Sequence, residues 1–302
     1  MKPKTSGRYQ WTAENHKPEY ETLASFGTMN LINDTEAIIK ANDICNRYGL
    51  DTIAAGAVIA FAIDCFENKV ITLEDTDGIQ LTWGNHRAMV AMTERMARRE
   101  GFGDVLADGI KQAAERIGRG AQEFAVHVGG VEPGMHDPKF GLQGAREQAM
   151  ARFQMDATPG RHTQHAFGRE ALAHHLVNAT GLCSFGYLGE MDVPKYLTEY
   201  LAAVTGWERS WEELQEDAER IMAIRQAFNS REGINPVQLT VHSRILGAPP
   251  LTAGPLAGIT VDPAEQIRND LKELDWDLAT AKPNRSKLVA LGLEDVARDL
   301  WP

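Results

Sequence analysis

Cysteine is scarce in this sequence. Cys45, Cys65 and Cys183 are the only three among 302 residues. Their odd number and wide spacing do not fit the disulfide framework of a small secreted domain, so a reducing compartment is indicated. We therefore expect the protein in the cytoplasm.

An excess of basic charge and a long apolar run are also missing. Lysine and arginine number 31 against 42 aspartates and glutamates, which gives a formal net charge of −11. This balance argues against binding of a nucleic-acid phosphate backbone as the main task. The longest apolar run, Ile53 to Ile63, is too short to span a bilayer. The N-terminal stretch has no apolar segment typical of a signal peptide. No nucleic-acid or membrane partner is expected.

The short catalytic signatures are absent as well. The sequence contains no GxGxxG or P-loop for nucleotides, no HExxH for zinc and no GxSxG for a nucleophilic serine. Its chemistry must therefore be sought in longer patterns.

Helix patterns dominate what is present. Residues 34–49 carry apolar side chains at helical spacing, with Asp34 or Thr35 as the N-cap and Gly49 as the stop. The next segment, 51–69, is apolar all round, which predicts a buried helix.

The character of the chain changes after residue 123. Residues 123–160 are rich in glycine and proline, which predicts loops. Helix signals then return, including a long helix that opens with the capping-box sequence SWEE. Strand signals are few, and the best is FAVHV, residues 124–128. The sequence thus predicts a mainly α protein of two helical domains, residues 1–123 and 124–302, with few short strands.

One short pattern occurs twice. Both NRYGLD and NATGLC read Asn-x-x-Gly-Leu, followed once by a carboxylate and once by a thiol. In each, a helix runs into a glycine, and the turn that follows exposes backbone groups. Such a turn is either a plain helix cap or a site for a planar heterocycle or a phosphate; two copies suggest a ligand with two similar halves. The candidate residues are Asn46, Gly49, Leu50 and Asp51 in the first copy and Asn178, Gly181, Leu182 and Cys183 in the second.

Two further stretches carry side chains suited to proton transfer. Tyr20 and Glu21 follow Pro18, and the choice is between a solvated loop and a carboxylate tuned in a pocket. His162 and His165 follow a Pro-Gly turn, where histidines either move protons and bind metal or are simply polar surface.

Several longer segments resemble one known family. KPEYET, ANDICNRYGLDTIAAGAVIAFAIDC, DGIQLTWGN, REGFGDVLADGIKQAAERIG, HVGGVEPGMHDPK and NATGLCSFG are similar to segments of the aldehyde ferredoxin oxidoreductases. These enzymes carry a tungsten, sometimes molybdenum, bis-pterin cofactor and one [4Fe–4S] cluster. Their chain has an N-terminal β-rich domain followed by two largely helical domains. The resemblance is good over residues 17–190, looser beyond, and covers the helical domains only.

The resemblance also implies roles for the candidate residues. The two Asn-x-x-Gly-Leu loops would bind the two pterins, and the family often has aspartate where Asn46 and Asn178 stand. Glu21, with Tyr20 beside it, matches the carboxylate near the metal. His162 is the best match for the histidine near the substrate, with His165 and His136 as competitors.

Cys183 would be the fourth ligand of the cluster. The family's Cys-x-x-Cys-x-x-x-Cys motif, which should stand just upstream of MKPKTSGRYQW, is missing together with the β-rich domain. We therefore expect a fragment or a split subunit that needs the missing domain as a partner and is inactive alone; a homodimer is possible.

The implied reaction oxidises an aldehyde and water to a carboxylic acid and passes two electrons through the cluster to ferredoxin. Related enzymes of the same architecture act instead on carboxylates or aromatic CoA thioesters. A non-catalytic helical binding module is the third alternative. The segment VQLTVHSRILGAPP departs from the family pattern, so the substrate is left open.

Overall fold

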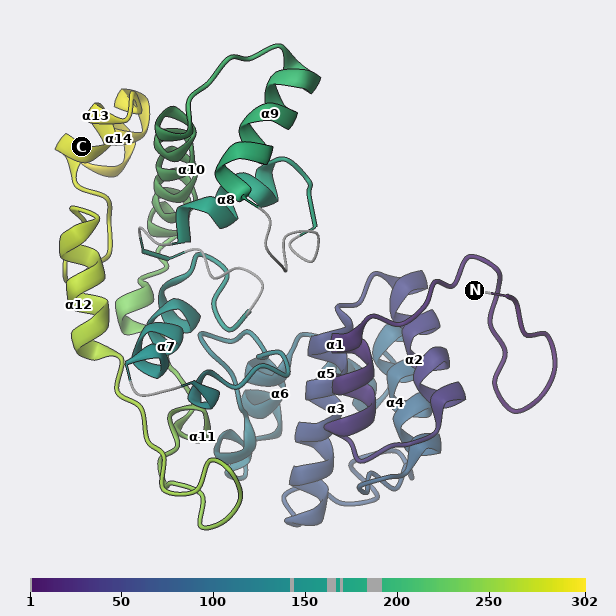
Figure 1. The fold of residues 1–302 in the computed structure, drawn as a ribbon. Coiled ribbons are helices and arrows are strands. Elements are labelled where there is room, and N and C mark those ends of the chain that lie inside the picture. Colours follow the sequence, from purple (N-terminus) through teal and green to yellow (C-terminus); the bar gives the residue numbers. More distant parts are fainter. Residues whose placement is uncertain (1, 142–143, 162–166, 169–170, 184–191) are drawn as a thin grey trace. The chain divides into compact units, whose positions relative to one another are not determined.

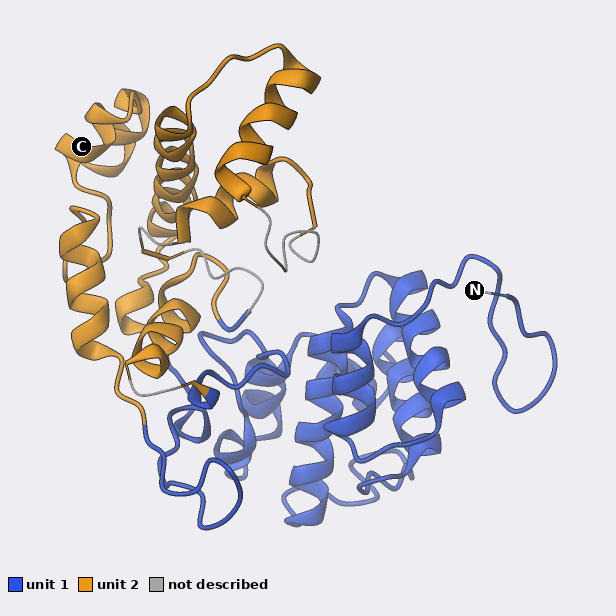
Figure 2. Ribbon diagram, in the orientation of Figure 1, with its two compact units in different colours: residues 1–140, 160–162, 240–260 blue, residues 141–159, 163–239, 261–302 orange. Residues whose placement is uncertain are grey.

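The computed structural model describes residues 2–141, 144–161, 167–168, 171–183 and 192–302. The chain divides into two compact units (Figure 2). Unit 1 comprises residues 1–140, 160–162 and 240–260, and unit 2 comprises the remainder. The predicted boundary between residues 123 and 124 stays a prediction.

The predicted mainly α fold is confirmed. Within the described residues the regular structure is helical, and the only β pairings are isolated bridges. The predicted strand at residues 124–128 is therefore wrong. Phe124 ends a 3₁₀ turn, and only Val128 pairs, with Val131 and with Val241. Phe124 and Ala125 pack against the helical core of unit 1, so a sheet is not needed to bury them.

Unit 1 is built from short and medium helices (Figure 1). They are α1 (Tyr20–Leu23), the π-helix η1 (Ala24–Thr28), α2 (Thr35–Tyr48), α3 (Thr52–Glu67), α4 (His86–Arg98), α5 (Phe102–Leu106), α6 (Ile110–Ile117), the 3₁₀ turns η2 (Ala121–Phe124) and η3 (Pro138–Phe140), and α11 (Ser243–Leu246).

Helix α2 begins and ends where its sequence predicts. Of the two proposed caps, Asp34 is the one used: its side chain accepts a hydrogen bond from the Ala37 N–H at 2.9 Å. Gly49 ends the helix in the left-handed region, with φ of 74°.

Helix α3 is the centre of the unit 1 core, as its all-round apolar sequence predicts. Val58, Ile59, Phe61 and Ile63 are each no more than 3% exposed, and they pack with apolar residues of α2, α4 and α6. Because α3 is buried on all sides, the groups at its two ends are held at fixed positions in the unit.

Among the described residues of unit 2, α-helices of 6 to 21 residues and one 3₁₀ turn form the regular structure (Figure 1). They are α7 (Ala145–Met155), α8 (Leu172–Ala179), α9 (Val193–Thr205), α10 (Trp211–Arg231), the 3₁₀ turn η6 (Pro236–Gln238), α12 (Ala264–Glu273), α13 (Arg285–Ala290) and α14 (Glu294–Leu300).

Helix α10 organises unit 2. The predicted capping box is present: the Ser210 hydroxyl accepts from the Glu213 N–H, and the Glu213 carboxylate accepts from the Ser210 N–H. One core lies between α10, α7, α8 and α12, and a second lies between the last turns of α10 and the terminal helices α13 and α14.

None of the helices in the described ranges is both long and apolar enough to cross a membrane.

Candidate functional site

The first Asn-x-x-Gly-Leu loop joins α2 to α3. The Leu50 N–H donates to the Cys45 carbonyl at 2.9 Å, five residues back, which is the wide hydrogen bond of a Schellman cap. Asp51 caps α3 by accepting from the Ala54 N–H at 2.8 Å. Asn46 and Asp51 are exposed and Leu50 is half-buried, so the polar ends of this loop are available to a ligand.

The second loop follows α8 and repeats this geometry. The Leu182 N–H donates to the Val177 carbonyl at 3.3 Å, again five residues back, and Gly181 has φ of 72° against 74° at Gly49. Asn178, Leu182 and Cys183 are exposed. A Cβ added at Gly49 or at Gly181 would meet no described residue within 4 Å. The repeated Asn-x-x-Gly-Leu pattern thus has a similar backbone conformation in both places, with space beside each glycine among the described residues.

A largely covered arginine side chain contacts the first loop. Nη2 of Arg161 lies 3.3 Å from the second carboxylate oxygen of Asp51, within unit 1. The Arg161 side chain is only 12% exposed, whereas that of Asp51 is 54% exposed. Sequence reasoning missed this pair, because a spacing of more than 100 residues leaves no local pattern.

Glu21 is buried rather than solvated. It is 7% exposed, and one carboxylate oxygen accepts a hydrogen bond from the Met135 N–H at 2.9 Å. Nε2 of His136 lies 3.7 Å from the other oxygen. The ring of Tyr20 meets the His136 ring edge-on, with centroids 5.9 Å apart. The structure therefore brings Tyr20, Glu21 and His136 together, and the solvated-loop alternative for Glu21 is wrong.

The structure describes Tyr20 but not the other two candidate histidines. Burial and the neighbouring carboxylate of Glu21 raise the pKa of the Tyr20 phenol, which keeps it a neutral donor. His162 and His165 lie outside the described residues. Of the three competing histidines, His136 is the one that the structure describes, and it lies beside Glu21.

The three thiols differ sharply in environment. Cys45 and Cys65 are buried on helices, and burial raises the pKa of each to about 12, whereas Cys183 is exposed. Among the residues with assigned positions, no group of three or more His, Cys, Asp or Glu side chains could hold a metal ion. Cys183 is therefore a single available ligand and not a complete metal site.

This difference predicts selective alkylation. Iodoacetamide should modify Cys183 in the native, cluster-free protein and reach Cys45 and Cys65 only after denaturation, because only an accessible thiolate reacts. Peptide mass spectrometry before and after denaturation measures this. Modification of Cys45 in the native protein would contradict the burial on which the assignment rests.

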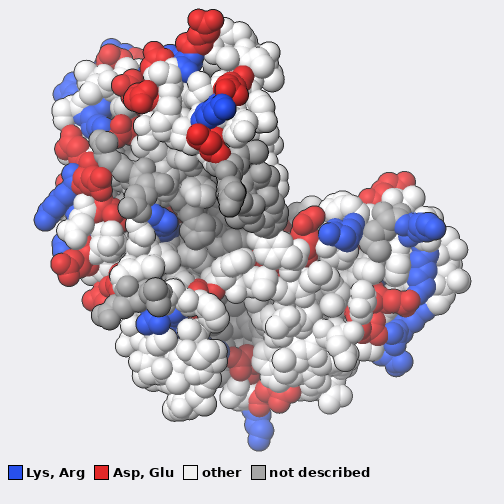
Figure 3. All heavy atoms as spheres, viewed as in Figure 1, with Lys and Arg blue, Asp and Glu red and all other residues white. Residues whose placement is uncertain are grey.

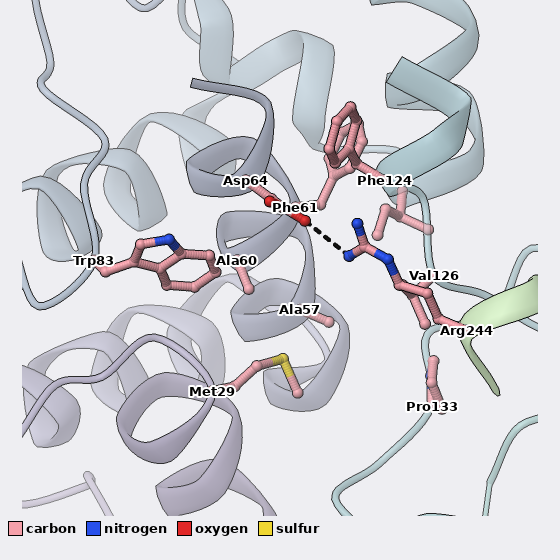
Figure 4. Close-up of a pocket in the computed structure, with 11 residues that line it drawn as sticks. Met29, Ala57, Ala60, Phe61, Asp64, Trp83, Phe124, Val126, Pro133 and Arg244 are labelled. Carbon is pink, nitrogen blue, oxygen red and sulfur yellow. Dashed lines mark hydrogen bonds and ion pairs between the residues drawn. The ribbon is translucent and has the colours of Figure 1, made fainter. Parts of the chain in front are cut away.

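A separate apolar pocket lies near the other end of α3 (Figure 4). It has a volume of about 270 Å³ and one charged wall, where the Arg244 guanidinium lies 2.8 Å from the Asp64 carboxylate. Asp64 stands near the C-terminal end of α3 and Asp51 at its N-terminal end, so this pocket is apart from the first loop. Its remaining lining residues are Met29, Ala57, Ala60, Phe61, Trp83, Ile110, Phe124, Val126 and Pro133.

Charges of both signs are mixed on the face seen in Figure 3. Lysine and arginine side chains are interspersed with aspartate and glutamate among the described residues of that face. They do not gather there into one broad basic surface.

These features define a mainly helical protein with two matching ligand-accessible loops, one exposed thiol beside the second, and a buried carboxylate close to a histidine. The chain belongs to the aldehyde ferredoxin oxidoreductase family: the family profile described as "Aldehyde ferredoxin oxidoreductase, domains 2 & 3" matches residues 2–293. The resemblance noted in the sequence is thereby confirmed.

Individual relatives agree with this assignment. The chain is 30% identical over 305 residues to a tungsten-containing aldehyde ferredoxin oxidoreductase of Pyrococcus abyssi, covering 93% of this chain and 49% of that protein. It is 31% identical over 153 residues to an aliphatic sulfonate oxidoreductase, WOR-like subunit, of Pyrococcus furiosus, covering 49% of this chain and 24% of that protein. The chain thus spans about half the length of the first of these relatives and a smaller share of the second.

A solved structure has the same fold. The active-site complex of a benzoyl-coenzyme A reductase with 1,5-dienoyl-CoA superposes with a TM-score of 0.69 at 20% identity, covering 96% of this chain and 52% of that chain. At this identity the likeness concerns the fold.

Proposed function

We propose that this chain supplies the two helical domains of a tungsten-pterin oxidoreductase that oxidises aldehydes to carboxylic acids and passes the electrons through a [4Fe–4S] cluster to ferredoxin. The observation that carries the proposal is the repeated loop. Two helix ends have the same Schellman geometry; one continues into Asp51 and the other into an exposed Cys183. Family membership and the tungsten-containing relatives support it.

The residues of both loops fit a pterin. Open space beside Gly49 and Gly181 lets a flat ring approach the backbone, and the exposed amides of Asn46 and Asn178 offer both donors and acceptors. Asp51 keeps lone pairs for the ring's N–H groups after capping α3. When bound, tungsten would supply Lewis acidity and a two-electron redox couple.

In this proposal Glu21 moves a proton. The Met135 N–H donates to one carboxylate oxygen, and the other, 3.7 Å from Nε2 of His136, would be the base that takes a proton from the attacking water. His136 orients that oxygen, and the Tyr20 ring limits how the imidazole can turn. His162, predicted from the resemblance, is the second candidate to act at the substrate oxygen.

Cys183 would bind one iron of the cluster. The other three ligands would come from residues outside this sequence, because Cys45 and Cys65 are buried in the unit 1 core. We propose that a β-rich domain or subunit brings them and covers the pterins from the other side. The isolated chain is then expected to be inactive, because half of the contacts to the cofactor are missing.

The test is Cys183→Ser in the protein purified anaerobically with any polypeptide that co-purifies. We expect the iron content to fall from about four atoms per chain to near zero, because a cluster usually takes four cysteine ligands. Cys65→Ala, which changes a buried thiol, is the matched control and should leave iron unchanged. Equal iron in the Cys183→Ser protein and the wild type would refute the proposal and favour a non-catalytic helical module.

A second substrate class has some support. The benzoyl-CoA reductase and the aliphatic sulfonate oxidoreductase are named for substrates other than free aldehydes. The second candidate function is therefore reduction of an aromatic CoA thioester or of a carboxylate by the same site. Parallel dye-linked assays with aldehydes, carboxylates and aromatic CoA thioesters separate the two: turnover of aldehydes alone supports the first.

A further inference from the structure

We propose that Arg161 is a positioning residue of the cofactor site, which holds the Asp51 carboxylate in place for the pterin; this inference rests on the proposed function. Its Nη2 lies 3.3 Å from one oxygen of Asp51, and the other oxygen caps α3 through the Ala54 N–H. Both oxygens are thus oriented before any ligand arrives, although each keeps a lone pair to accept another hydrogen bond.

The burial of Arg161 requires an explanation. An exposed ion pair contributes little, but a guanidinium that is only 12% exposed loses much of its hydration and needs compensation. The Asp51 carboxylate provides it directly. Burial raises the pKa of Glu132, and Arg161 acts against that rise. Arg161 therefore places a positive charge beside the Asp51 carboxylate at the start of α3.

Glu132 is fixed by its own contacts. It is 4% exposed, and its Oε1 accepts the N–H of Ile110, the first residue of α6, at 2.6 Å. A Cβ at Gly109 would lie 3.0 Å from that oxygen. Because Glu132 cannot easily move, its carboxyl group keeps a constant position at the start of α6.

The backbone that carries Arg161 is also fixed. Gly160 has φ of 73°, and a Cβ there would lie 3.3 Å from the Val131 carbonyl oxygen and 3.5 Å from Cβ of Val128. This close approach places the backbone of residue 161 against the Val128–Val131 turn of unit 1. From there the long Arg161 side chain reaches Asp51 in the α2–α3 loop.

One donor of Arg161 is left over. Nη1 is buried and has no hydrogen-bond partner among the described residues. A buried donor without an acceptor is unfavourable, so an acceptor on the bound cofactor would be favoured there. This gives Arg161 a second way to favour a pterin, beyond holding Asp51.

The first experiment is a double-mutant cycle in thermal unfolding. Asp51→Asn removes the charge but keeps a good cap, and Arg161→Met removes the guanidinium but keeps an apolar stem. Arg161→Met should lower Tm by about 2–4 °C in the wild type and by clearly less in the Asp51→Asn background. Arg119→Met, which breaks the exposed 3.1 Å pair with Asp75, is the control and should give additive shifts with Asp51→Asn. Additive shifts for Arg161 and Asp51 would overturn the inference.

The second experiment separates positioning from simple stability. Bound pterin and tungsten are measured per folded chain in the complex with the polypeptide that co-purifies, after anaerobic purification. We expect the Arg161→Met protein to contain at most about one tenth of the wild-type pterin, as for other residues that orient a ligand. The Arg161→Lys protein should contain an intermediate amount, and the Arg119→Met protein should contain as much pterin as the wild type. Equal pterin in Arg161→Met and wild type overturns the inference alone. A wild-type complex that includes the partner polypeptide but contains no pterin overturns the proposed function, and this inference with it.

Discussion

In the proposed oxidoreductase complex, replacing Glu21 with glutamine is expected to lower the rate of aldehyde oxidation by about 10²- to 10⁴-fold, the usual contribution of a positioned general base. Glutamine has nearly the same shape and its carbonyl oxygen can still accept the Met135 N–H. The amide cannot take a proton from water, so the loss should fall on kcat and not on folding. Steady-state rates with an artificial electron acceptor, divided by tungsten content, measure it.

The neighbouring Glu19 offers a matched control. It stands two residues before Glu21 at the start of α1 but is exposed. Glu19→Gln makes the same chemical change without touching the buried carboxylate, and it should keep wild-type rates. A Glu21→Gln protein within twofold of wild type, with normal tungsten, would remove Glu21 from the mechanism.

Local features of the fold could be predicted from the sequence, because they depend on neighbours within a few residues. The cap at Asp34, the stop at Gly49 and the all-round burial of α3 follow from residue types at helical spacing. The same holds for the thiols: Cys45 and Cys65 stand among apolar helical residues and are buried.

The environment of the candidate site could not be predicted in this way. Glu21 is buried because the Met135 N–H, 114 residues away, meets its carboxylate. The residues around Glu21 alone favoured a solvated loop, since a polar side chain before an apolar stretch gives no sign of a distant partner. Only the resemblance to the family assigned it a role.

The Arg161 contact has the same origin. The sequence singles out His162 as a candidate residue and gives its neighbour Arg161 no role. In the structure Arg161 is the residue that pairs with Asp51. The strand predicted at residues 124–128 failed for a related reason: apolar alternation shows that side chains are buried but not whether a sheet or a set of helices buries them.

The α1–η1 segment, which carries Glu21, packs closely against the N-terminal half of α3. Asn30 donates from its amide both to the Ser25 carbonyl at 2.6 Å and to the Gly56 carbonyl at 3.1 Å. The Thr22 and Thr52 hydroxyls are 2.8 Å apart. A Cβ added at Gly56 would lie 2.7 Å from the carbonyl carbon and from Cβ of Ser25, closer than real atoms approach. Glycine at position 56 therefore allows the backbone of η1 to approach α3 this closely.

Gly56→Ala should accordingly destabilise unit 1 and disturb Glu21 together. Overpacking of this kind costs about 1–3 kcal/mol, and the backbone of η1 must move because the clash is with main-chain atoms. Ser25 follows Glu21 by one helical turn, so that movement also shifts the carboxylate away from the Met135 N–H. We expect a Tm lower by about 2–4 °C for each kcal/mol lost, and a rate loss greater than the loss of folded protein explains. Gly141→Ala, where the added Cβ would make an ordinary 3.5 Å contact, should change neither. An unchanged Tm in Gly56→Ala would mean that α1 and η1 are free to move off α3, and the fixed position of Glu21 would then need another cause.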